Sequence, residues 1–241
     1  MSNFARPQPI GSQDHRAGAI IVAAGHSSRM EGVDKLFLPL LGIPLLAHTL
    51  DAFESAPSVQ SVVLVLSPAN LEQGKAIVQE KGFAKVHKVC IGGERRQDSV
   101  RMGLEHLAPH TWVIVHDGAR PCVEPELIER GLEEAARWGS AVAAVPVKDT
   151  IKVVGEHGMV METPDRQTLW AVQTPQVFPW DVFRQAYRQT GMEATDDATL
   201  VERLGHPVHI FFGSYANIKV TTREDVLVAE TLLRRREGQA V

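Results

Sequence analysis

The stretch that decides the fold is Ala-Ile-Ile-Val-Ala-Ala-Gly-His-Ser-Ser-Arg-Met-Glu-Gly-Val-Asp-Lys, residues 19–35. Its first five residues are apolar and rich in β-branched side chains, which is typical of a short strand buried on both faces. Small residues follow at Ala24 and Gly25, where the backbone can approach a ligand closely and loop amides can point at anionic oxygens. Arg29 and Lys35 add a bidentate donor and a compact positive charge. Such a loop indicates phosphate binding, although an ordinary strand-to-helix turn with two solvated cations fits this stretch equally well.

Length and composition define the class of protein. With 241 residues, 44% of them hydrophobic and 22% charged, we expect one globular domain with a sizeable core. The net charge of −4 argues against general nucleic-acid binding. Residues 1–18 are polar and lack the apolar segment of a signal peptide, so we expect a disordered tail before a domain over residues 19–241. No apolar run is long enough to cross a bilayer, so we expect a cytoplasmic protein without membrane contact. Cys90 and Cys122 are far apart and form no CxxC pair, so we expect neither a disulfide nor a zinc site.

Strand-like and helix-like segments alternate along the first half of the chain. A second buried strand is predicted at Ser61–Leu66, and further strands at Val86–Ile91, Trp112–His116 and Ala141–Val145. Helices are predicted from Pro44, from Asn70 as the cap of a helix reaching about Lys81, and from Pro125. This alternation predicts a Rossmann-like α/β fold, with a mostly parallel sheet flanked by helices.

In such sheets ligands bind at the carboxyl ends of the strands. The glycine turn Gly92-Gly93 follows one expected strand, and Asp117 follows another. Both therefore fall at the expected binding edge, together with the loop after the first strand. This agreement favours the phosphate-binding interpretation of the opening stretch.

The second half of the chain departs from simple alternation. Residues Asp149–Val154 and Met159–Glu162 are predicted to form two strands around a glycine-containing turn. Because a lone hairpin is only marginally stable in water, we expect this protruding arm, about residues 149–173, to rest on a second subunit. A helix is predicted at Trp180–Gln189, a helix start at Asp196-Asp197, a strand at Val208–Phe212 and a closing helix at Arg223–Arg236.

Five cations lie in loops or at the ends of expected elements: Arg29, Lys35, Arg120, Arg166 and Lys219. Together with the carboxylate of Asp117 they indicate phosphoryl or nucleotidyl transfer, in which cations neutralise growing charge and Mg²⁺ is shared between carboxylate and phosphates. The Walker A motif is absent from the sequence, and no GxGxxG follows the first strand, which argues against a P-loop ATPase and a dinucleotide-dependent dehydrogenase. Asp196-Asp197 suits a helix cap at least as well as a metal or hydroxyl contact.

Taken together, the motifs resemble the 2-C-methyl-D-erythritol 4-phosphate cytidylyltransferase family over nearly the whole chain from Ala19 onward. They are Ala23-Ala24-Gly25…Arg29-Met30, Gly92-Gly93…Arg96…Ser99-Val100, His116-Asp117-Gly118-Ala119-Arg120-Pro121, Asp149-Thr150-Ile151-Lys152, Arg166…Leu169-Trp170…Gln173-Thr174-Pro175-Gln176, Ala194-Thr195-Asp196-Asp197-Ala198 and Asn217-Ile218-Lys219-Val220-Thr221. Many nucleotidyltransferases share the first motif, whereas the residues from 149 to 176 and from 217 to 221 are much more specific to this family.

The resemblance implies an enzyme of non-mevalonate isoprenoid biosynthesis that joins CTP and 2-C-methyl-D-erythritol 4-phosphate, releasing pyrophosphate and using Mg²⁺ or another divalent cation. It implies that Arg29 and Lys35 brace the triphosphate, and that Asp117 holds the metal with Arg120 near the sugar phosphate. The cytosine would be read by Gly92, Gly93 and Ser99 beside the backbone of Ala23, Ala24 and Gly25. The sugar phosphate would be positioned by Thr150, Arg166 and Lys219, and Thr174 is included among the substrate-binding residues. It also implies a homodimer in which the arm carries Arg166 to the neighbour's site.

The sequence departs from the family pattern in two places. Ser27 stands where a second glycine is usual, and Asp34-Lys35-Leu36 stands where Pro-Lys-Gln is usual. The opening loop is therefore as similar to molybdopterin-type cytidylyltransferases, although the downstream motifs favour the methylerythritol family. Ribitol 5-phosphate cytidylyltransferases are close relatives and leave a second polyol phosphate open as the substrate. A non-catalytic nucleotide-binding module would not need Arg166 and Lys219 in addition to the cations of the opening loop.

Overall fold

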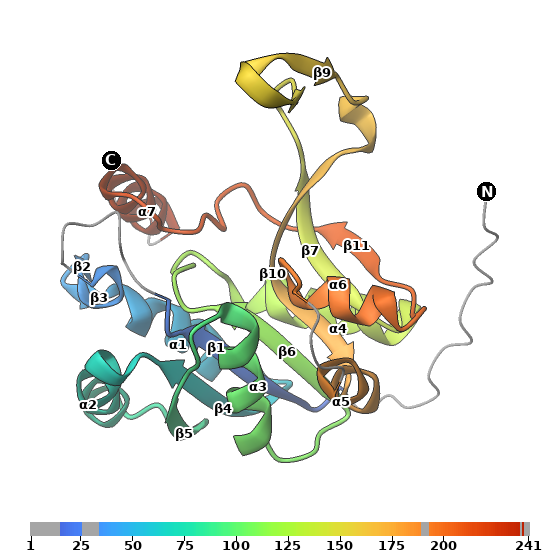
Figure 1. The fold of residues 1–241 in the computed structure, drawn as a ribbon. Helices are drawn as coiled ribbons and strands as arrows, with labels where there is room; N and C mark the ends of the chain where they lie inside the picture. Colours follow the sequence, from blue (N-terminus) through green and yellow to red (C-terminus); the bar gives the residue numbers. More distant parts are fainter. Residues whose placement is uncertain (1–14, 26–33, 189–192, 237, 239–241) are drawn as a thin grey trace.

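The fold is built around a central sheet (Figure 1). The computed structural model describes residues 15–25, 34–188, 193–236 and 238. In this part of the chain the sheet has seven strands in the order β11-β7-β10-β6-β1-β4-β5. Their bounds are β1 Ala17–Ala23, β4 Val59–Leu66, β5 Val86–Ile91, β6 Trp112–Asp117, β7 Ala141–Pro146, β10 Trp170–Pro179 and β11 His209–Phe212. Only β10 pairs antiparallel with its neighbours, β6 and β7, so the prediction of a mostly parallel sheet is confirmed.

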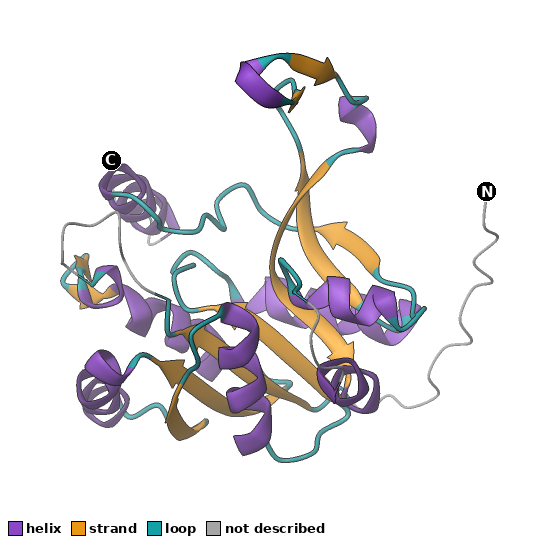
Figure 2. Ribbon diagram, viewed as in Figure 1, coloured by secondary structure: helices purple, strands orange, loops and turns teal. Residues whose placement is uncertain are grey.

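Helices cover both faces of this sheet (Figure 2). One face packs against α1 (Leu45–Ser55), α2 (Leu71–Lys81), α4 (Pro125–Trp138) and α7 (Arg223–Arg236), which share one buried hydrophobic cluster. The other face packs against α3 (Arg96–His106), α5 (Trp180–Arg188) and α6 (Asp197–Arg203), which share a second cluster. Burial on both faces explains why inner strands such as β1 and β7 are continuously apolar rather than alternating, whereas the edge strand β5 contains the exposed polar residues His87 and Lys88.

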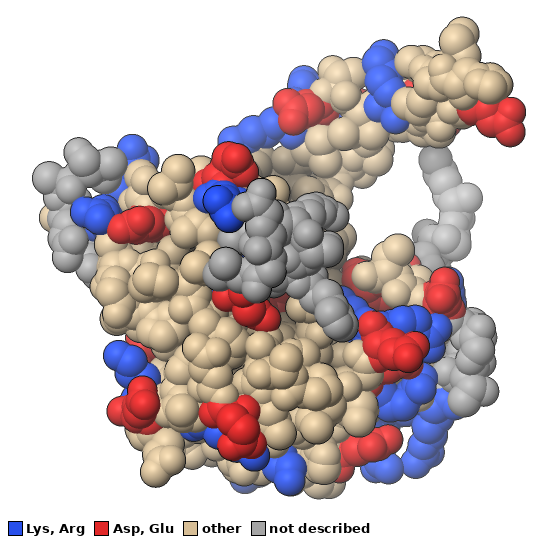
Figure 3. Space-filling model, turned by 60° about the vertical axis from the view of Figure 1, so that its left-hand side comes forward, with Lys and Arg blue, Asp and Glu red and all other residues tan. Residues whose placement is uncertain are grey.

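The hairpin arm extends β7 and β10 beyond the body of the protein. At its end β8 (Val153–Val154) pairs antiparallel with β9 (Val160–Glu162), and the 3₁₀ turns η3 (Glu156–Gly158) and η4 (Arg166–Thr168) complete it. Figure 3 shows the arm standing clear of the described body, with much of its visible surface uncharged. The exposed apolar side chains are Ile151, Val153, Val154, Met159, Val160, Met161, Trp170 and Val172. The predicted hairpin is confirmed, although its paired strands are shorter than expected.

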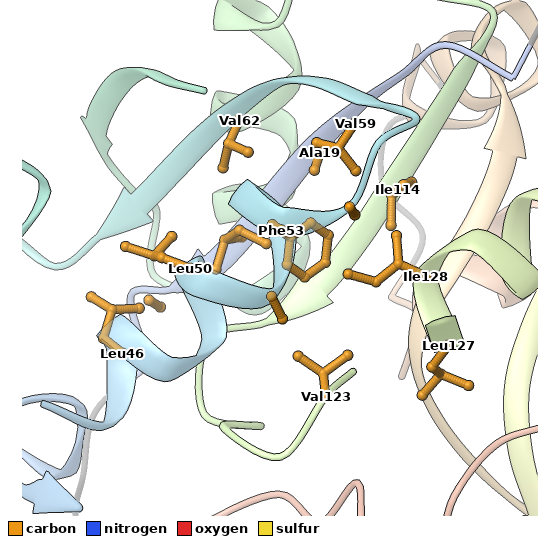
Figure 4. Packing of buried hydrophobic residues seen from close by; sticks show 14 of the residues in the cluster. Ala19, Leu46, Leu50, Phe53, Val59, Val62, Ile114, Val123, Leu127 and Ile128 are labelled. Carbon is orange, nitrogen blue, oxygen red and sulfur yellow. The ribbon is translucent and has the colours of Figure 1, made fainter. Parts of the chain in front are cut away.

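The core beneath the sheet is centred on α1. Phe53 is fully buried and lies among Leu50, Val59, Ile114 and Ile128 (Figure 4). These side chains come from two helices and two strands, so they fix α1 and α4 against the strands that carry the binding edge. Truncation of a buried aromatic residue typically costs about 3–5 kcal/mol of stability. Of the described helices, none is both long and apolar enough to cross a membrane.

The main difference from the sequence prediction is β10, which was not expected as a strand. The segment Gln173-Thr174-Pro175-Gln176 is polar, and proline removes a donor from a ladder and is rare in central strands. The structure accommodates it because the pairing with β7 is interrupted between Val172 and Gln176. The polar side chains of this interruption face the functional cleft described below, which is why the strand lacks an apolar signature.

Smaller differences concern element ends. The first strand begins at Ala17, two residues before the predicted start of the domain, and Gln189 lies outside the described residues. Asn70 does precede α2 but makes no capping hydrogen bond to it. Its side-chain amide instead donates to the carboxylate of Asp34, so the predicted capping role is wrong. This contact ties the segment before Lys35 to the end of β4.

Candidate active site

Two adjoining pockets lie at the carboxyl end of the sheet. The first, about 230 Å³, is lined by Val22, Ala23, Gly25, Lys35, Leu36, Arg96, Asp117, Ala119 and Lys219. The second, about 460 Å³, is lined by Arg96, Asp117, Arg120, Val172, Gln173, Thr174, Gln176, Thr195, Asp196, Thr199, Glu202 and Lys219. They share Arg96, Asp117 and Lys219. We therefore treat them as two compartments of one cleft, with these three residues at their common wall.

Asp117, the last residue of β6, is the only carboxylate in that common wall. Its Oδ1 lies 3.2 Å from Nε of Arg96, and its Oδ2 lies 3.0 Å from Nζ of Lys219 and 3.5 Å from Nε of Arg120. Its side chain is only 9% exposed. Burial opposes ionisation, but the positive charges of Arg96, Lys219 and Arg120 outweigh it and hold the pKa of Asp117 well below its ordinary value. The carboxylate is therefore ionised at neutral pH.

Lys219 reaches the wall from a loop that is fastened to the end of β6. Arg120 donates to the carbonyl of Asn217 over 2.7 Å, and the backbone amide of Val220 donates to the carbonyl of Ala119 over 2.8 Å. The Asn217 side chain also donates to the carbonyl of Thr174 over 2.8 Å, while the amide of Asp117 donates to the Thr174 hydroxyl over 3.0 Å. These bonds hold three segments together although their residues are far apart in the sequence. The Lys219 side chain itself stays 41% exposed.

Lys35 enters the first pocket from the start of η1 (Lys35–Phe37). Asp34 caps this turn by accepting a hydrogen bond from the amide of Leu36 over 3.0 Å. Burial lowers the pKa of Lys35, and the charge of Lys219 lowers it further, while the carboxylates of Asp34 and Asp117 raise it in part. Two ammonium groups that disfavour each other in one pocket create a site where a bound anion relieves the repulsion. Arg29, predicted for the same loop, lies outside the described residues, as does Ser27.

The glycine turn after β5 lies against the loop after β1. A Cβ atom on Gly92 would lie 2.6 Å from both Cβ of Ala24 and Oγ of Ser99, so this close approach requires glycine. Ser99 is buried, and its hydroxyl is within hydrogen-bond distance of the carbonyls of Gly93 (3.3 Å) and Arg95 (3.2 Å). Gly92 thus packs against Ala24 of the loop after β1, but Gly92, Gly93 and Ser99 are not among the residues that line the two pockets.

The arm places the two remaining predicted residues away from the cleft of their own chain. Thr150 and Arg166 are both exposed, and Arg166 donates to the carbonyl of Lys148 over 2.8 Å. The single chain therefore brings together Lys35, Asp117, Arg120, Thr174 and Lys219, but it does not add Thr150 or Arg166 to them. Neither Thr150 nor Arg166 is among the residues that line the two pockets.

With this geometry described, comparison with known proteins identifies the family. The family model for 2-C-methyl-D-erythritol 4-phosphate cytidylyltransferase matches residues 17–235. The chain belongs to the 2-C-methyl-D-erythritol 4-phosphate cytidylyltransferase family. A curated cytidylyltransferase of this name from Dehalococcoides mccartyi is 53% identical over 222 residues, covering 92% of this chain and 98% of the relative. Another from Pelotomaculum thermopropionicum is 47% identical over 231 residues, covering 93% and 97%.

Solved structures of the cytidylyltransferase family have the same architecture. The 4-diphosphocytidyl-2C-methyl-D-erythritol synthase of Anaerococcus prevotii superposes with a TM-score of 0.81 at 28% identity, covering 92% of this chain and 98% of that one. The 2-C-methyl-D-erythritol 4-phosphate cytidylyltransferase of Thermus thermophilus superposes with a TM-score of 0.73 at 35% identity, covering 91% and 99%. The resemblance stated from the sequence is thereby confirmed for family and fold.

One member of this cytidylyltransferase's cleft was not predicted as a site residue. Arg96 appears in the glycine-turn motif, but nothing in the sequence shows that its side chain reaches Asp117 and Asp197 from the start of α3. Asp196 and Asp197, which are adjacent in the sequence, have different roles in the structure. Asp196 caps α6 by accepting a hydrogen bond from the amide of Thr199 over 3.0 Å, as expected, whereas Asp197 is fully buried against Arg96.

The cleft also suits a divalent cation that is shared with a substrate. Among the described residues, no group of three or more His, Cys, Asp and Glu side chains could hold a metal. Mg²⁺, however, keeps several waters and commonly uses one or two carboxylates together with substrate phosphates. The ionised Asp117, which borders both pockets, fits that pattern.

Proposed function

We propose that this chain transfers the cytidylyl group of CTP to 2-C-methyl-D-erythritol 4-phosphate and releases pyrophosphate. The observation that carries this proposal is the common wall of Arg96, Asp117 and Lys219, because it offers positive charge and one carboxylate at the border between two pockets. A reaction that joins two phosphate-bearing substrates needs this arrangement. Membership of the family, at about half identity to curated relatives, supports the same substrates.

We assign the first pocket to the nucleotide. It has the small residues Ala23 and Gly25 after β1 and the cation Lys35. Arg29 of the same loop would add a second donor to the triphosphate. The close-packed loop of Ala24 with the turn of Gly92, Gly93 and Ser99 would limit the size of the base and favour cytosine.

We assign the second pocket to the methylerythritol phosphate. Arg120 and Thr174 line it, and Lys219 stands at its border with the first pocket. A phosphate oxygen of this substrate would attack the α-phosphorus of CTP in line. The new P–O bond forms as the bond to pyrophosphate breaks. Because the second pKa of a phosphate monoester is about 6, the nucleophile is already an anion near neutral pH and needs no general base.

The work left to the protein is to bring two anions together and to stabilise the charge of the transition state. Lys35 would donate to oxygens of the triphosphate and of the reacting phosphorus, and Lys219 would donate to the phosphate of the methylerythritol substrate. Mg²⁺ or another divalent cation, held by Asp117, would neutralise phosphate charge when it is bound. Each of these groups acts by position and charge.

A homodimer completes the proposal. The arm exposes apolar side chains such as Val160 and Met161, and it carries Thr150 and Arg166 away from the cleft of its own chain. A partner subunit would cover the apolar surface and receive Thr150 and Arg166 at its sugar-phosphate pocket. A cytoplasmic location stays a prediction.

The test is release of pyrophosphate on mixing the protein with CTP, Mg²⁺ and methylerythritol phosphate. We expect turnover in this mixture, little with ribitol 5-phosphate, and none with CTP alone. Higher kcat/KM with ribitol 5-phosphate would reassign the second substrate, and nucleotide binding without turnover with either would favour a non-catalytic module. Replacing CTP by ATP or GTP should lower kcat/KM steeply; similar values would contradict the proposed cytosine pocket.

A further inference from the structure

Behind the common wall of the two pockets lies a carboxylate that takes no part in the proposed contacts with substrate. Asp197, the first residue of α6, is fully buried. Its Oδ2 accepts a hydrogen bond from Nη1 of Arg96 over 2.7 Å, and its Oδ1 accepts one from the hydroxyl of Tyr187 on α5. Both carboxylate oxygens are therefore engaged by protein groups. Asp197 also differs from Asp117 in that it is not among the residues that line the two pockets.

Arg96 connects this buried carboxylate with the wall. Its Nε points to Asp117 over 3.2 Å while its Nη1 points to Asp197. The guanidinium is planar and presents its donors in a fixed fork, so fixing one edge fixes the other. The contacts run from Tyr187 through Asp197 and Arg96 to Asp117, and they join α5, α6, α3 and β6 at one point.

The balance of charge gives Asp197 a second effect on Asp117. Three cations, Arg96, Arg120 and Lys219, lie around Asp117, which carries a single negative charge. Asp197 shares the charge of Arg96 and so leaves Asp117 less completely neutralised. Without it, all three cations would act on Asp117 alone, and its attraction for a further cation would fall.

Stability alone is a weak reason for such an arrangement. The desolvation of buried ions offsets most of their attraction, and well-packed apolar side chains often stabilise a fold as well. The position of Arg96 in the walls of both pockets instead links the buried pair with the site of reaction.

We propose that Asp197, held by Tyr187, is a positioning residue that fixes the guanidinium of Arg96 and thereby sets the orientation and effective charge of Asp117 at the common wall. This inference rests on the proposed function and deepens it. The motif at residues 194–198 would then serve to position a residue of the cleft, and would not contact substrate itself.

The experiment compares Arg96→Lys, Asp197→Asn, their combination and Tyr187→Phe in the full-length protein. Lysine keeps the charge but cannot bridge two carboxylates, and asparagine keeps the shape of Asp197 without its charge. Arg95→Lys is the matched control, because Arg95 is adjacent in sequence but pairs with Asp98 and Glu193 on the exposed surface. The readouts are kcat and KM, thermal unfolding, and Mn²⁺ binding in the presence of CTP, followed by electron paramagnetic resonance.

We expect Arg96→Lys and Asp197→Asn each to lower kcat, and to raise the Mn²⁺ concentration needed for half-saturation, by roughly 10- to 100-fold, the range typical for outer partners of a metal-binding carboxylate. The combined variant should be no worse than the more impaired single one, since both changes break the same connection. Tyr187→Phe should have a smaller effect in the same direction, and Arg95→Lys should match the wild type.

Unchanged kcat and unchanged Mn²⁺ binding in a folded Asp197→Asn protein would overturn the proposal, as would additive losses in the combined variant. A loss confined to thermal stability would show a purely structural ion pair and would also overturn it. If Asp197→Asn does not fold, Tyr187→Phe decides: reduced kcat supports the connection, and wild-type kcat and Mn²⁺ binding reject it. Failure of the proposed function itself would be seen separately, as absent turnover in the wild type.

Discussion

The cleft and the arm use charged and apolar residues in opposite ways. In the cleft, Asp117 and Arg96 are enclosed by partners from several elements of the same chain. On the arm, Arg166 is exposed and donates to the nearby backbone carbonyl of Lys148, while Val160 and Met161 expose their apolar side chains. The common wall of the cleft is thus built by contacts within one chain, whereas the exposed residues of the arm are the ones that a second chain would cover. Changes in the cleft should therefore act within a subunit, and changes on the arm should act between subunits.

The largest effect is expected in the cleft. Lys35→Ala should lower kcat by ~10²-fold or more, because oriented donors to transition-state charge are typically worth that much. Thermal unfolding should change little, since Lys35 packs at the edge of a pocket. Near-normal turnover in the folded variant would remove Lys35 from the reacting groups. The same change at Arg29 tests the segment outside the described residues.

The next prediction tests whether the two regions meet across a subunit interface. Arg166→Ala and Lys35→Ala proteins should each be nearly inactive alone. A mixed dimer would contain one site with both changes and one with neither, so random pairing should restore up to about a quarter of wild-type activity. The measurement is turnover after mixing under conditions that exchange subunits. No recovery despite demonstrated exchange would show that each chain builds its site alone.

A charge placed on the arm should weaken assembly. Met161 is 72% exposed, and Met161→Glu should raise the dimer dissociation constant by about 10-fold or more, because burying a methionine side chain is worth about 1.5–3 kcal/mol. Analytical ultracentrifugation measures this shift. Leu227→Glu is the matched control, since Leu227 on α7 is 67% exposed but lies on the body. Equal effects of the two variants would refute a specific role for the arm.

Two capping aspartates allow a direct comparison of the regions. Asp34 caps the turn of Lys35, and Asp165 caps the turn of Arg166 with a 3.0 Å bond to the amide of Gln167. Asp34→Ala should lower the free energy of unfolding by about 1 kcal/mol and reduce kcat several-fold, because a half-buried cap and its link to Asn70 are lost together. Asp165→Ala, which is exposed, should leave stability nearly unchanged. Chemical denaturation of both variants checks this difference.

The smallest effect concerns pH. Burial, followed by the charge of Lys219, lowers the pKa of Lys35, so its ammonium loses its proton at a lower pH than an ordinary lysine near 10.4. Activity should therefore decline on the alkaline side at a lower pH than an unperturbed lysine would cause. Lys35→Arg, whose charge persists, should move this decline to higher pH. An unmoved alkaline limb would assign the decline to another group.

The sequence was sufficient for those parts of the fold that local patterns encode. The apolar runs of β1 and β7 and the helical spacing of α1 predicted their positions, and Asp117 was placed at the binding edge because it follows a buried strand. β10 could not be predicted, because polar residues at its centre line the cleft and its pairing with β7 is interrupted between Val172 and Gln176. The contact between Arg96 and Asp197 joins residues 101 positions apart, and only the folded chain brings them together. Asp196 and Asp197 are adjacent and of the same residue type, so the sequence does not distinguish them. Only their burial in the folded chain shows that Asp196 caps α6 and that Asp197 pairs with Arg96.

The place of β10 in the sheet also determines the order in which the protein can assemble. The strands β5, β4, β1 and β6 are neighbours in the sheet and have all been synthesised by Asp117, so this half can form its ladders early. β7 lies between β10 and β11, both of which follow it in the chain. On the ribosome β7 has no sheet partner until the arm and residues 170–179 have emerged. Both edges of the apolar strand β7, Ala-Val-Ala-Ala-Val-Pro, therefore stay unpaired while the arm is being synthesised. We expect the nascent chain to be most prone to aggregation at this stage.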